Sequence, residues 1–169
     1  MPKISTDLHD RLSHVRLLAM DVDGVLTDGG VYILESGEEF RRFDIKDGLG
    51  LKRVIATGIH IVWISAGKCE SVRKRATNLG IMHVYLGIDE KMSILEHFCQ
   101  NKAIRLDSVA YIGDDLTDLQ VLQSVGVAFA PADAINQIKE IANYVTSRRG
   151  GCGAVREVCD ILLASLLGK

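Results

Sequence analysis

Apolar and polar positions along this chain form two kinds of block. Short, almost continuous apolar runs are typical of strands that are buried on both faces of a parallel sheet. They predict strands at residues 15–21, 59–65, 83–87, 108–113 and 125–130. Between them, apolar residues recur at helical spacing and predict helices at residues 48–57, 70–79, 91–101 and 116–124. Strands that alternate with helices indicate an α/β fold with a doubly wound parallel sheet.

The segment that follows the first strand has a different pattern. In VYILESGEEFRRF (31–43), two short strand-like pieces flank residues 35–38, which have the composition of a tight turn. We expect a β-hairpin here. The pattern leaves open whether it projects as a flap over the edge of the sheet or simply extends that edge.

The remaining pattern predicts one domain over residues 1–169. The chain has only two prolines and shows no repeat and no low-complexity segment. From about residue 147, a glycine-rich tail leads into a last helical segment. Ligands of doubly wound folds bind beyond the carboxyl ends of the strands, so candidate chemistry is sought there.

Composition and charge exclude several classes of function. Charged residues make up 25% of the chain and the formal net charge is -2, so no basic surplus suggests nucleic acid. No apolar run reaches the ~18 residues of a membrane span, and the N-terminal segment lacks the apolar region of a secretion signal. The four cysteines are scattered, which favours reduced thiols over a disulfide framework or a zinc site. We therefore expect a cytoplasmic protein without membrane or nucleic-acid partners.

The first strand ends in two carboxylates. In LLAMDVDG (17–24), Asp21 and Asp23 are two positions apart, so both side chains can face one pocket, and Gly24 lets the backbone leave the sheet. One carboxylate could act as nucleophile and the other as general acid and base. A calcium-binding EF-hand is excluded, because apolar residues stand where that loop needs an oxygen ligand and a glycine. A capping or turn pair remains as a structural alternative.

A second acidic cluster follows a later strand. In YIGDDLTDLQ (111–120), Asp114, Asp115 and Asp118 come where the strand opens into a helix. Acidic residues at a helix start can simply favour the helix dipole. Two acidic clusters at the same edge of a sheet are better explained by a divalent cation, and ligands that are all oxygen suit Mg²⁺.

Cations are needed if these carboxylates are to act on a phosphate. Two unit charges ~4 Å apart repel by roughly 4 kcal/mol at an effective dielectric constant of 20, and a phosphate dianion about doubles this. A Mg²⁺ ion would offset part of the repulsion. Lys91 begins a predicted helix and could contribute a second cation, while Ser65 ends a strand and could donate a hydrogen bond. Taken alone, Lys91 is better explained as a solvated surface residue, and Ser65 is equally well explained as a helix cap.

In this order, DVDGVLTDG, Ser65, Lys91 and GDDLTD resemble the four motifs of the haloacid dehalogenase (HAD) phosphatase superfamily. The resemblance implies a HAD-like Rossmannoid fold and phosphoryl transfer. It implies that Asp21 becomes an aspartyl phosphate, and that Asp23 protonates the leaving alcohol and then activates water. Ser65 and Lys91 would hold the transferring phosphoryl group.

The same resemblance implies how Mg²⁺ would be bound. The carboxylates of Asp21 and Asp114 and the backbone carbonyl of Asp23 would be its protein ligands. Asp115 and Asp118 would lie close behind them, and the motif does not decide which of the two matters more.

The spacing leaves no room for the inserted cap domain of many superfamily members. About thirty residues separate Asp28 from the strand that begins at residue 59, and they must hold the hairpin and a helix. An open pocket either serves a large substrate or is closed by another subunit. This favours a homo-oligomer.

Two further segments narrow the resemblance. Residues 31–54 and the tail SRRGGCGAVREVCDILLASLLGK (147–169) are similar to the tetrameric phosphatases of 3-deoxy-D-manno-octulosonate 8-phosphate (KDO 8-phosphate), an intermediate of lipopolysaccharide synthesis. The similarity runs from about residue 15 to 163. It implies a homotetrameric phosphoric monoester hydrolase whose tail enters the neighbour's active site. Arg148, Arg149 and Arg156 would then contact the acidic sugar, since a guanidinium group suits carboxylates.

The second motif departs from this family. Its members usually have Thr-Gly-Arg, where this chain has Ser65-Ala66-Gly67-Lys68. Serine keeps the hydroxyl group, and Ala66 and Lys68 would face the substrate, but lysine lacks the planar fork of arginine. Related phosphatases of nine-carbon ulosonic acid 9-phosphates also depart here, so such a compound is the alternative substrate.

An alternative of another class is a non-catalytic oligomerisation module. Similar domains, with their catalytic residues lost, are appended to some sugar-nucleotide synthetases. In this chain Asp21, Asp23, Lys91 and Asp114 are all present, which favours an enzyme.

Overall fold

Six parallel strands form the central sheet, and β1 lies in its middle. The computed structural model describes residues 4–167. Within them the strand order is β5-β4-β1-β6-β7-β8. The strands are β1 Leu17–Met20, β4 His60–Ser65, β5 His83–Leu86, β6 Val109–Ile112, β7 Val127–Ala130 and β8 Tyr144–Val145. Leu17 pairs with His60 on one side and with Val109 on the other, so the order reverses at β1. This is the doubly wound sheet that the alternation predicts.

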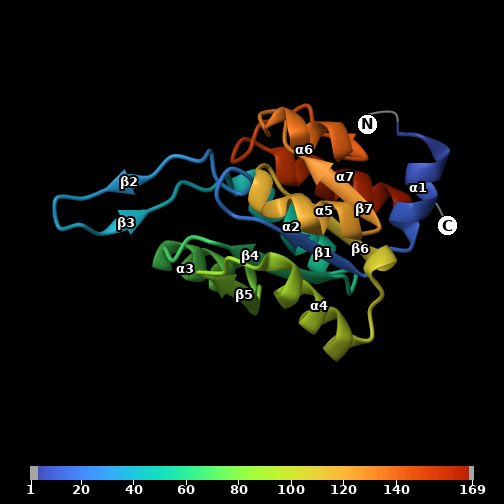
Figure 1. Cartoon of the computed structure of the whole chain (residues 1–169), viewed down its shortest axis with the longest axis horizontal. Coiled ribbons are helices and arrows are strands. Elements are labelled where there is room, and N and C mark those ends of the chain that lie inside the picture. Colours follow the sequence, from blue (N-terminus) through green and yellow to red (C-terminus); the bar gives the residue numbers. More distant parts are fainter. Residues whose placement is uncertain (1–3, 168–169) are drawn as a thin grey trace.

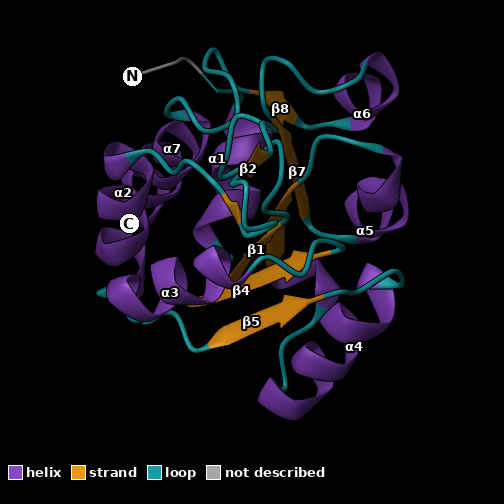
Figure 2. Cartoon of the chain, turned by 90° about the vertical axis from the view of Figure 1, so that its left-hand side faces the viewer, coloured by secondary structure: helices purple, strands orange, loops and turns teal. Residues whose placement is uncertain are grey.

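Helices cover both faces of this sheet. One layer contains α1 Thr6–Ser13, α2 Ile45–Ile55, α3 Glu70–Leu79 and α7 Ala154–Leu167; the other contains α4 Lys91–Lys102, α5 Leu119–Ser124 and α6 Asn136–Ile141 (Figure 2). Successive side chains of a strand point to opposite layers. Trp63 packs into the cluster under α2 and α7, and its neighbour Ile64 packs into the cluster under α4 and α5. Every residue of β1, β6 and β7 is buried, which explains their unbroken apolar runs.

The hairpin projects from the body of the molecule (Figure 1). Its strands β2 Tyr32–Ile33 and β3 Glu39–Phe40 pair only with each other within the described residues, as a separate antiparallel sheet. The backbone N–H of Gly37 donates to the carbonyl of Leu34 at 2.8 Å, and Gly37 has φ +80°, which glycine adopts most readily. The hairpin is therefore an arm, and it does not extend the edge of the central sheet.

All five predicted strands and all four predicted helices are present, with some of their ends displaced. The helix predicted from residue 48 begins at Ile45, because the side chain of Asp44 accepts a hydrogen bond from the N–H of Lys46 at 2.6 Å and caps it. The helix predicted over 116–124 is divided into a 3₁₀ turn, Leu116–Asp118, and α5. A second 3₁₀ turn, Leu106–Ser108, precedes β6. The pattern did not predict α1, α6 or β8. Between residues 4 and 167, no helix has both the length and the apolar character needed to cross a bilayer.

Candidate active site

The loop after β1 brings the first acidic pair to the edge of the sheet. The backbone N–H of Asp21 still donates to the carbonyl of Ile112 in β6, at 3.1 Å. The chain then turns away from the sheet at Gly24, which has φ +84°. A Cβ atom at position 24 would also lie 2.1 Å from Oδ2 of Asp114. Glycine is thus required here twice, by the turn and by the close approach of the second acidic cluster.

A pocket of about 210 Å³ opens beyond the carboxyl ends of β1, β4 and β6. Its lining residues are Asp21, Asp23, Ser65, Ala66, Gly67, Lys91, Asp114, Asp115 and Thr117. Most of the residues that the sequence singled out, from four separate segments, therefore surround one small space. Thr117 joins them without having been predicted.

Beneath this pocket, Lys91 connects two carboxylates. Its Nζ atom lies 3.0 Å from Oδ2 of Asp21 and 2.8 Å from Oδ1 of Asp118, and all three side chains are nearly inaccessible to solvent. Burial would lower the pKa of Lys91, but the charges of Asp21 and Asp118 raise it above its ordinary value. The lysine is therefore held as a cation directly against Asp21.

Asp118 has both of its oxygens occupied. Oδ1 also accepts from the hydroxyl of Tyr111 at 2.7 Å, and Oδ2 accepts from the backbone N–H groups of Asp114 at 3.1 Å and Asp115 at 3.4 Å. A side chain with this many hydrogen bonds orients its neighbours and has little capacity left for a ligand. Asp115, in contrast, is exposed and caps the 3₁₀ turn through the N–H of Leu116. Asp118 and Asp115 therefore differ in their surroundings: Asp118 is a buried centre of hydrogen bonds, and Asp115 is an exposed cap.

Asp21 and Asp114 are in an unfavourable environment for bare carboxylates. Burial, followed by the charge of Asp118, raises the pKa of Asp21 to about 7, against the opposing effect of Lys91. Burial, followed by the charges of Asp21 and Asp118, raises the pKa of Asp114 to about 8. Both shifts express the cost of concentrating negative charge away from water. A bound cation would remove that cost.

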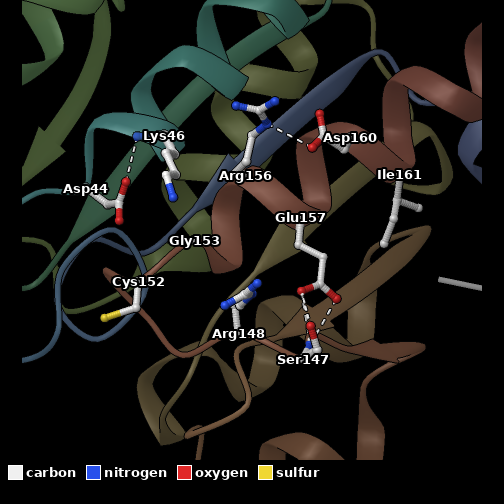
Figure 3. A pocket seen from close by; sticks show the side chains of 10 residues that line it. All are labelled: Asp44, Lys46, Ser147, Arg148, Cys152, Gly153, Arg156, Glu157, Asp160 and Ile161. Atoms are coloured by element: carbon white, nitrogen blue, oxygen red, sulfur yellow. Dashed lines mark hydrogen bonds and ion pairs between the residues drawn. The ribbon is translucent and has the colours of Figure 1, made fainter. Parts of the chain in front are cut away.

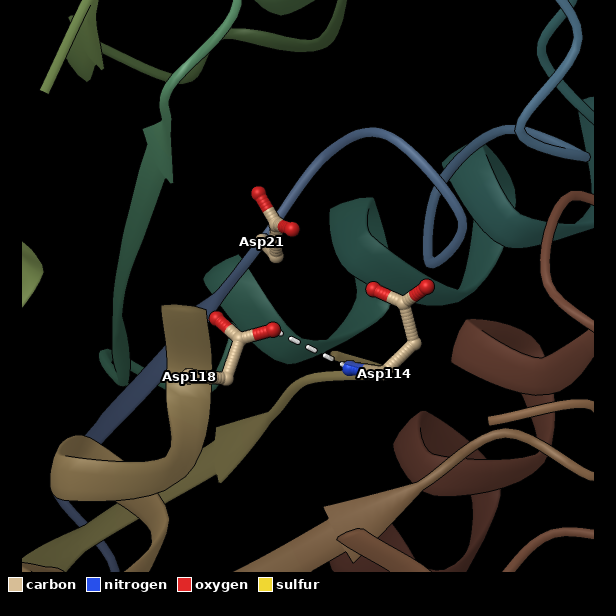
Figure 4. Close-up of side chains that lie close together, drawn as sticks. All are labelled: Asp21, Asp114 and Asp118. Carbon is tan, nitrogen blue, oxygen red and sulfur yellow. Dashed lines mark hydrogen bonds between the residues drawn. The ribbon is translucent and has the colours of Figure 1, made fainter. Parts of the chain in front are cut away.

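The arrangement fits a divalent cation. Carboxylate oxygens of Asp21, Asp114 and Asp118 lie within 4.8 Å of one another (Figure 4). Since both oxygens of Asp118 already accept hydrogen bonds, Asp21 and Asp114 are the carboxylates that remain as metal ligands. Oδ1 of Asp114 is buried and has no hydrogen-bond partner among the described residues. Such an oxygen, in a set of donors that are all oxygen, suits Mg²⁺.

Asp23 lines the same pocket and has different partners. Its Oδ2 accepts a hydrogen bond from the hydroxyl of Ser65 at 3.3 Å. Its Oδ1 accepts one from Nε of Arg41, in the chain that leaves the hairpin, at 2.7 Å. The hydroxyl of Ser65 in turn accepts from the N–H of Gly67 at 3.0 Å. The two members of the acidic pair thus differ: Asp21 is paired with a buried lysine and Asp23 with an arginine.

Three of the predicted substrate-binding residues lie elsewhere in this chain. Lys68 is exposed and lines a cavity beside the hairpin. Arg148 and Arg156 line a separate cavity of about 590 Å³ between the start of α2 and the start of α7 (Figure 3). There Nε of Arg156 pairs with Asp160 at 2.8 Å. Arg149, also considered from sequence, pairs with Asp133 at 3.1 Å. Of the predicted substrate contacts, only Ala66 lines the pocket of Asp21.

Sequence reasoning missed Tyr111, Arg41 and Thr27. The hydroxyl of Thr27 accepts from the N–H groups of Gly24 at 3.2 Å and Gly29 at 3.3 Å, which holds the loop after β1. Tyr111 has the pattern of an ordinary core residue, and Arg41 that of a surface charge. Their roles depend on contacts between distant segments, and only Thr27, within the first motif, carried a signal that could have been followed.

Comparisons with known proteins agree with this geometry. Residues 66–155 match the family model described as haloacid dehalogenase-like hydrolase. The chain is 41% identical over 160 residues to the 3-deoxy-D-manno-octulosonate 8-phosphate phosphatase KdsC of Salmonella typhi, covering 95% of this chain and 85% of the relative.

Solved structures are similar over nearly the whole chain. The phosphatase of the same name from Yersinia pestis superimposes with a TM-score of 0.94 at 39% identity, covering 96% of this chain and 88% of that one. The Moraxella catarrhalis phosphatase, solved with magnesium, phosphate and KDO, gives a TM-score of 0.93 at 36% identity and covers 96% and 93%.

Proposed function

Because the chain belongs to the family of 3-deoxy-D-manno-octulosonate 8-phosphate phosphatases, within the haloacid dehalogenase-like hydrolases, we propose that it hydrolyses KDO 8-phosphate to KDO and inorganic phosphate. The observation that carries this proposal is the pocket that two differently paired carboxylates, Asp21 and Asp23, line together with Lys91. The product would supply lipopolysaccharide synthesis. The four unpaired cysteine thiols support action in the reducing cytoplasm.

In the first step, an oxygen of the Asp21 carboxylate attacks phosphorus. The bond between phosphorus and the sugar oxygen breaks, its electron pair stays on that oxygen, and the oxygen takes the proton of Asp23, so that the alcohol leaves neutral. In the second step, a water oxygen attacks the aspartyl phosphate and gives its proton to Asp23. The bond to Asp21 breaks, and phosphate is released. One carboxylate is the nucleophile and the other moves one proton in each direction.

Lys91 and Ser65 would assist by position and charge. Nζ of Lys91 already lies 3.0 Å from the attacking carboxylate, where it offsets the repulsion between that carboxylate and an incoming phosphate. Ser65 is buried, and its hydroxyl donates to Asp23, which also lines the pocket. Asp118 would keep Lys91 and the backbone of Asp114 in place, and Asp115 would order the turn that follows.

The carboxylates of Asp21 and Asp114 and the carbonyl of Asp23 would hold Mg²⁺. Mg²⁺ supplies positive charge that neutralises the phosphoryl oxygens as negative charge builds up on them. The buried, unpartnered oxygen of Asp114 supports this assignment. Of the described acidic residues at the pocket, Asp114 is the one with a buried carboxylate oxygen that has no hydrogen-bond partner.

We also propose that the chain acts as a homotetramer. Large apolar side chains of the hairpin and the start of α2 are exposed, which is typical of a surface that another chain covers. They are Val31, Tyr32, Ile33, Leu34, Phe40, Ile45 and Leu49. In such an assembly, Lys68, Arg148 and Arg156 could reach the substrate in a neighbour's pocket, which they do not do within one chain.

Phosphate release tests the proposed function. KDO 8-phosphate, a nine-carbon ulosonic acid 9-phosphate and a hexose phosphate would each be tried with Mg²⁺ and with EDTA. We expect hydrolysis that needs Mg²⁺ and prefers the eight-carbon acid. In Asp21→Asn, turnover should fall about a thousandfold or more because the nucleophile is lost. Asp28→Asn is the matched control, since Asp28 lies in the same loop and does not line the pocket.

Each other outcome would contradict a different part of the proposal: the substrate, the nucleophile or catalysis itself. Preference for the nine-carbon acid would make Gly67 a marker of that alternative substrate. Equal turnover in Asp21→Asn and wild type would remove Asp21 as the nucleophile. An inactive wild-type protein that still assembles as a tetramer would support the non-catalytic module.

A further inference from the structure

Arg41 reaches the active site from the hairpin. It follows β3, and its Nε donates to Oδ1 of Asp23 at 2.7 Å, while its side chain is only 7% exposed. The lining of the pocket includes Asp23 but not Arg41. The guanidinium group therefore contacts Asp23 without lining the pocket itself.

The guanidinium group is itself held in place. Its Nη1 donates to Oε2 of Glu39 at 3.3 Å and to the carbonyl of Phe40 at 3.4 Å. The backbone N–H of Arg41 donates to the hydroxyl of Ser71 in α3, at 3.2 Å. A group anchored at both its backbone and its tip loses little further freedom when it orients a neighbour. The hydrogen bond to Ser71 thus fixes the base of the hairpin against α3 at Arg41.

The other oxygen of Asp23 faces the pocket. Oδ2 accepts from Ser65. A Cβ atom at position 67 would lie 2.7 Å from this oxygen and displace it, so the observed position requires glycine there. Asp23 is therefore held between Arg41 on one oxygen and Ser65 on the other. Since Asp23 is about one-third exposed, packing alone does not fix its rotamer, and the two hydrogen bonds do.

We propose that Arg41 is a positioning residue that fixes the carboxyl group of Asp23 with Oδ2 toward the leaving oxygen. The inference rests on the proposed function, in which Asp23 gives a proton to that oxygen. Arginine suits this role because its charge is permanent and its Nε and Nη donors lie in one rigid plane. The hairpin then positions the group that transfers the proton.

The dependence of the rate on the leaving group tests this role. A sugar alkoxide must be protonated to leave, whereas p-nitrophenolate leaves without a proton, so in the first step only the sugar-acid phosphate needs a well-placed Asp23. Both substrates share the second step, so the rate of the first step is measured in a single turnover, from release of the alcohol or the phenolate. In Arg41→Met, we expect this first-step rate for the sugar-acid phosphate to fall about a hundredfold with KM changed less than about threefold, because a small misplacement of a catalytic group has an effect of this size. For p-nitrophenyl phosphate, the first-step rate should fall less than about threefold. Arg41→Lys should restore part of the loss, since its ammonium group can still donate to Asp23.

Arg42→Met is the matched control. Arg42 is the next residue on the same segment and pairs with Asp28 at 3.4 Å, away from the pocket, so both substrates should be hydrolysed at nearly the wild-type rate. Equal losses of the first-step rate on the two substrates in Arg41→Met, or a change in KM alone, would overturn the positioning role while wild-type activity left the proposed function standing. A wild-type protein that hydrolyses neither compound would overturn the proposed function, and the positioning role with it.

Discussion

Two ionic networks of this protein have nearly the same bond lengths and opposite surroundings. Under the active site, Lys91 lies 3.0 Å from Asp21 and 2.8 Å from Asp118, and the exposed fractions of the three side chains are 1%, 9% and 0%. Between α2 and α7, Asp160 lies 2.8 Å from both Arg53 and Arg156, and the exposed fractions are 39%, 50% and 29%. The first joins one cation to two anions, and the second joins one anion to two cations.

The comparison teaches that distance alone does not indicate what an ion pair does. Exposed pairs contribute about 0–1 kcal/mol, because water and salt screen them. Removing one member of a buried pair typically costs about 3–5 kcal/mol, because a charge is left unpaired away from water. We therefore expect the network of Lys91 to be fixed before any substrate arrives, and that of Asp160 to remain free to exchange partners.

The largest effect is expected where the buried network is broken. In Lys91→Met, Asp21 and Asp118 would be left facing each other without a cation. We expect the free energy of unfolding, measured with urea, to fall by about 3–5 kcal/mol, and phosphate release to be lost. Lys52→Met, on the exposed side of α2, is the control and should change the free energy of unfolding by less than about 0.5 kcal/mol. Similar values for the two variants would mean that the network of Lys91 is accessible to water.

The sequence predicts some regions of this protein much better than others. The acidic pocket could be predicted, because Asp21, Ser65 and Asp114 each lie at or just beyond the end of an apolar strand, and the carboxyl ends of parallel strands meet at one edge. The helix at residues 70–79 was predicted with its correct ends. Its pattern is long enough to be distinctive. In contrast, α1 buries only two apolar side chains, Leu8 and Leu12, and α6 is only 6 residues long.

The rest depends on which side chains meet in space. Tyr111 is an ordinary strand residue until β6 pairs beside β1 and its hydroxyl reaches Asp118. Arg41 reaches Asp23 only because the base of the hairpin is held against α3. Neither contact leaves a periodic pattern, so the sequence could indicate the reacting groups but not what holds them.

A third buried carboxylate, Asp47, contacts Arg156 of the exposed network. We expect its effect on stability to be intermediate between those of the two networks. Its Oδ1 accepts from the N–H of Arg156 at 2.7 Å, at the start of α7, and its Oδ2 is buried without a partner among the described residues. Burial raises its pKa to about 6. In the folded state Asp47 therefore holds its proton to higher pH than in the unfolded state, and the protein loses stability as pH rises from about 4 through about 6.

Asp47→Asn should remove this pH dependence. The asparagine oxygen can still accept from Arg156, and the side chain is neutral at every pH. Between pH 5 and pH 7, wild type should lose about 1 kcal/mol more unfolding free energy than the variant, and up to about 3 kcal/mol over the whole range. Urea unfolding at the two pH values measures this difference. Parallel losses in both proteins would show that Asp47 is ionised throughout, with a partner or water on Oδ2.

The smallest effect is expected in the exposed network. Arg53→Ala and Asp160→Ala, combined in a double-mutant cycle, should give a coupling energy of about 0.2–1 kcal/mol at low salt. In about 1 M salt, where the screening length falls to about 3 Å, most of it should vanish. A coupling well above 1 kcal/mol that persists in high salt would show that this face is shielded from solvent. Only another chain could shield it, since α2 and α7 leave these side chains exposed within one chain, so this outcome would support the tetramer at the surface that carries Arg148 and Arg156.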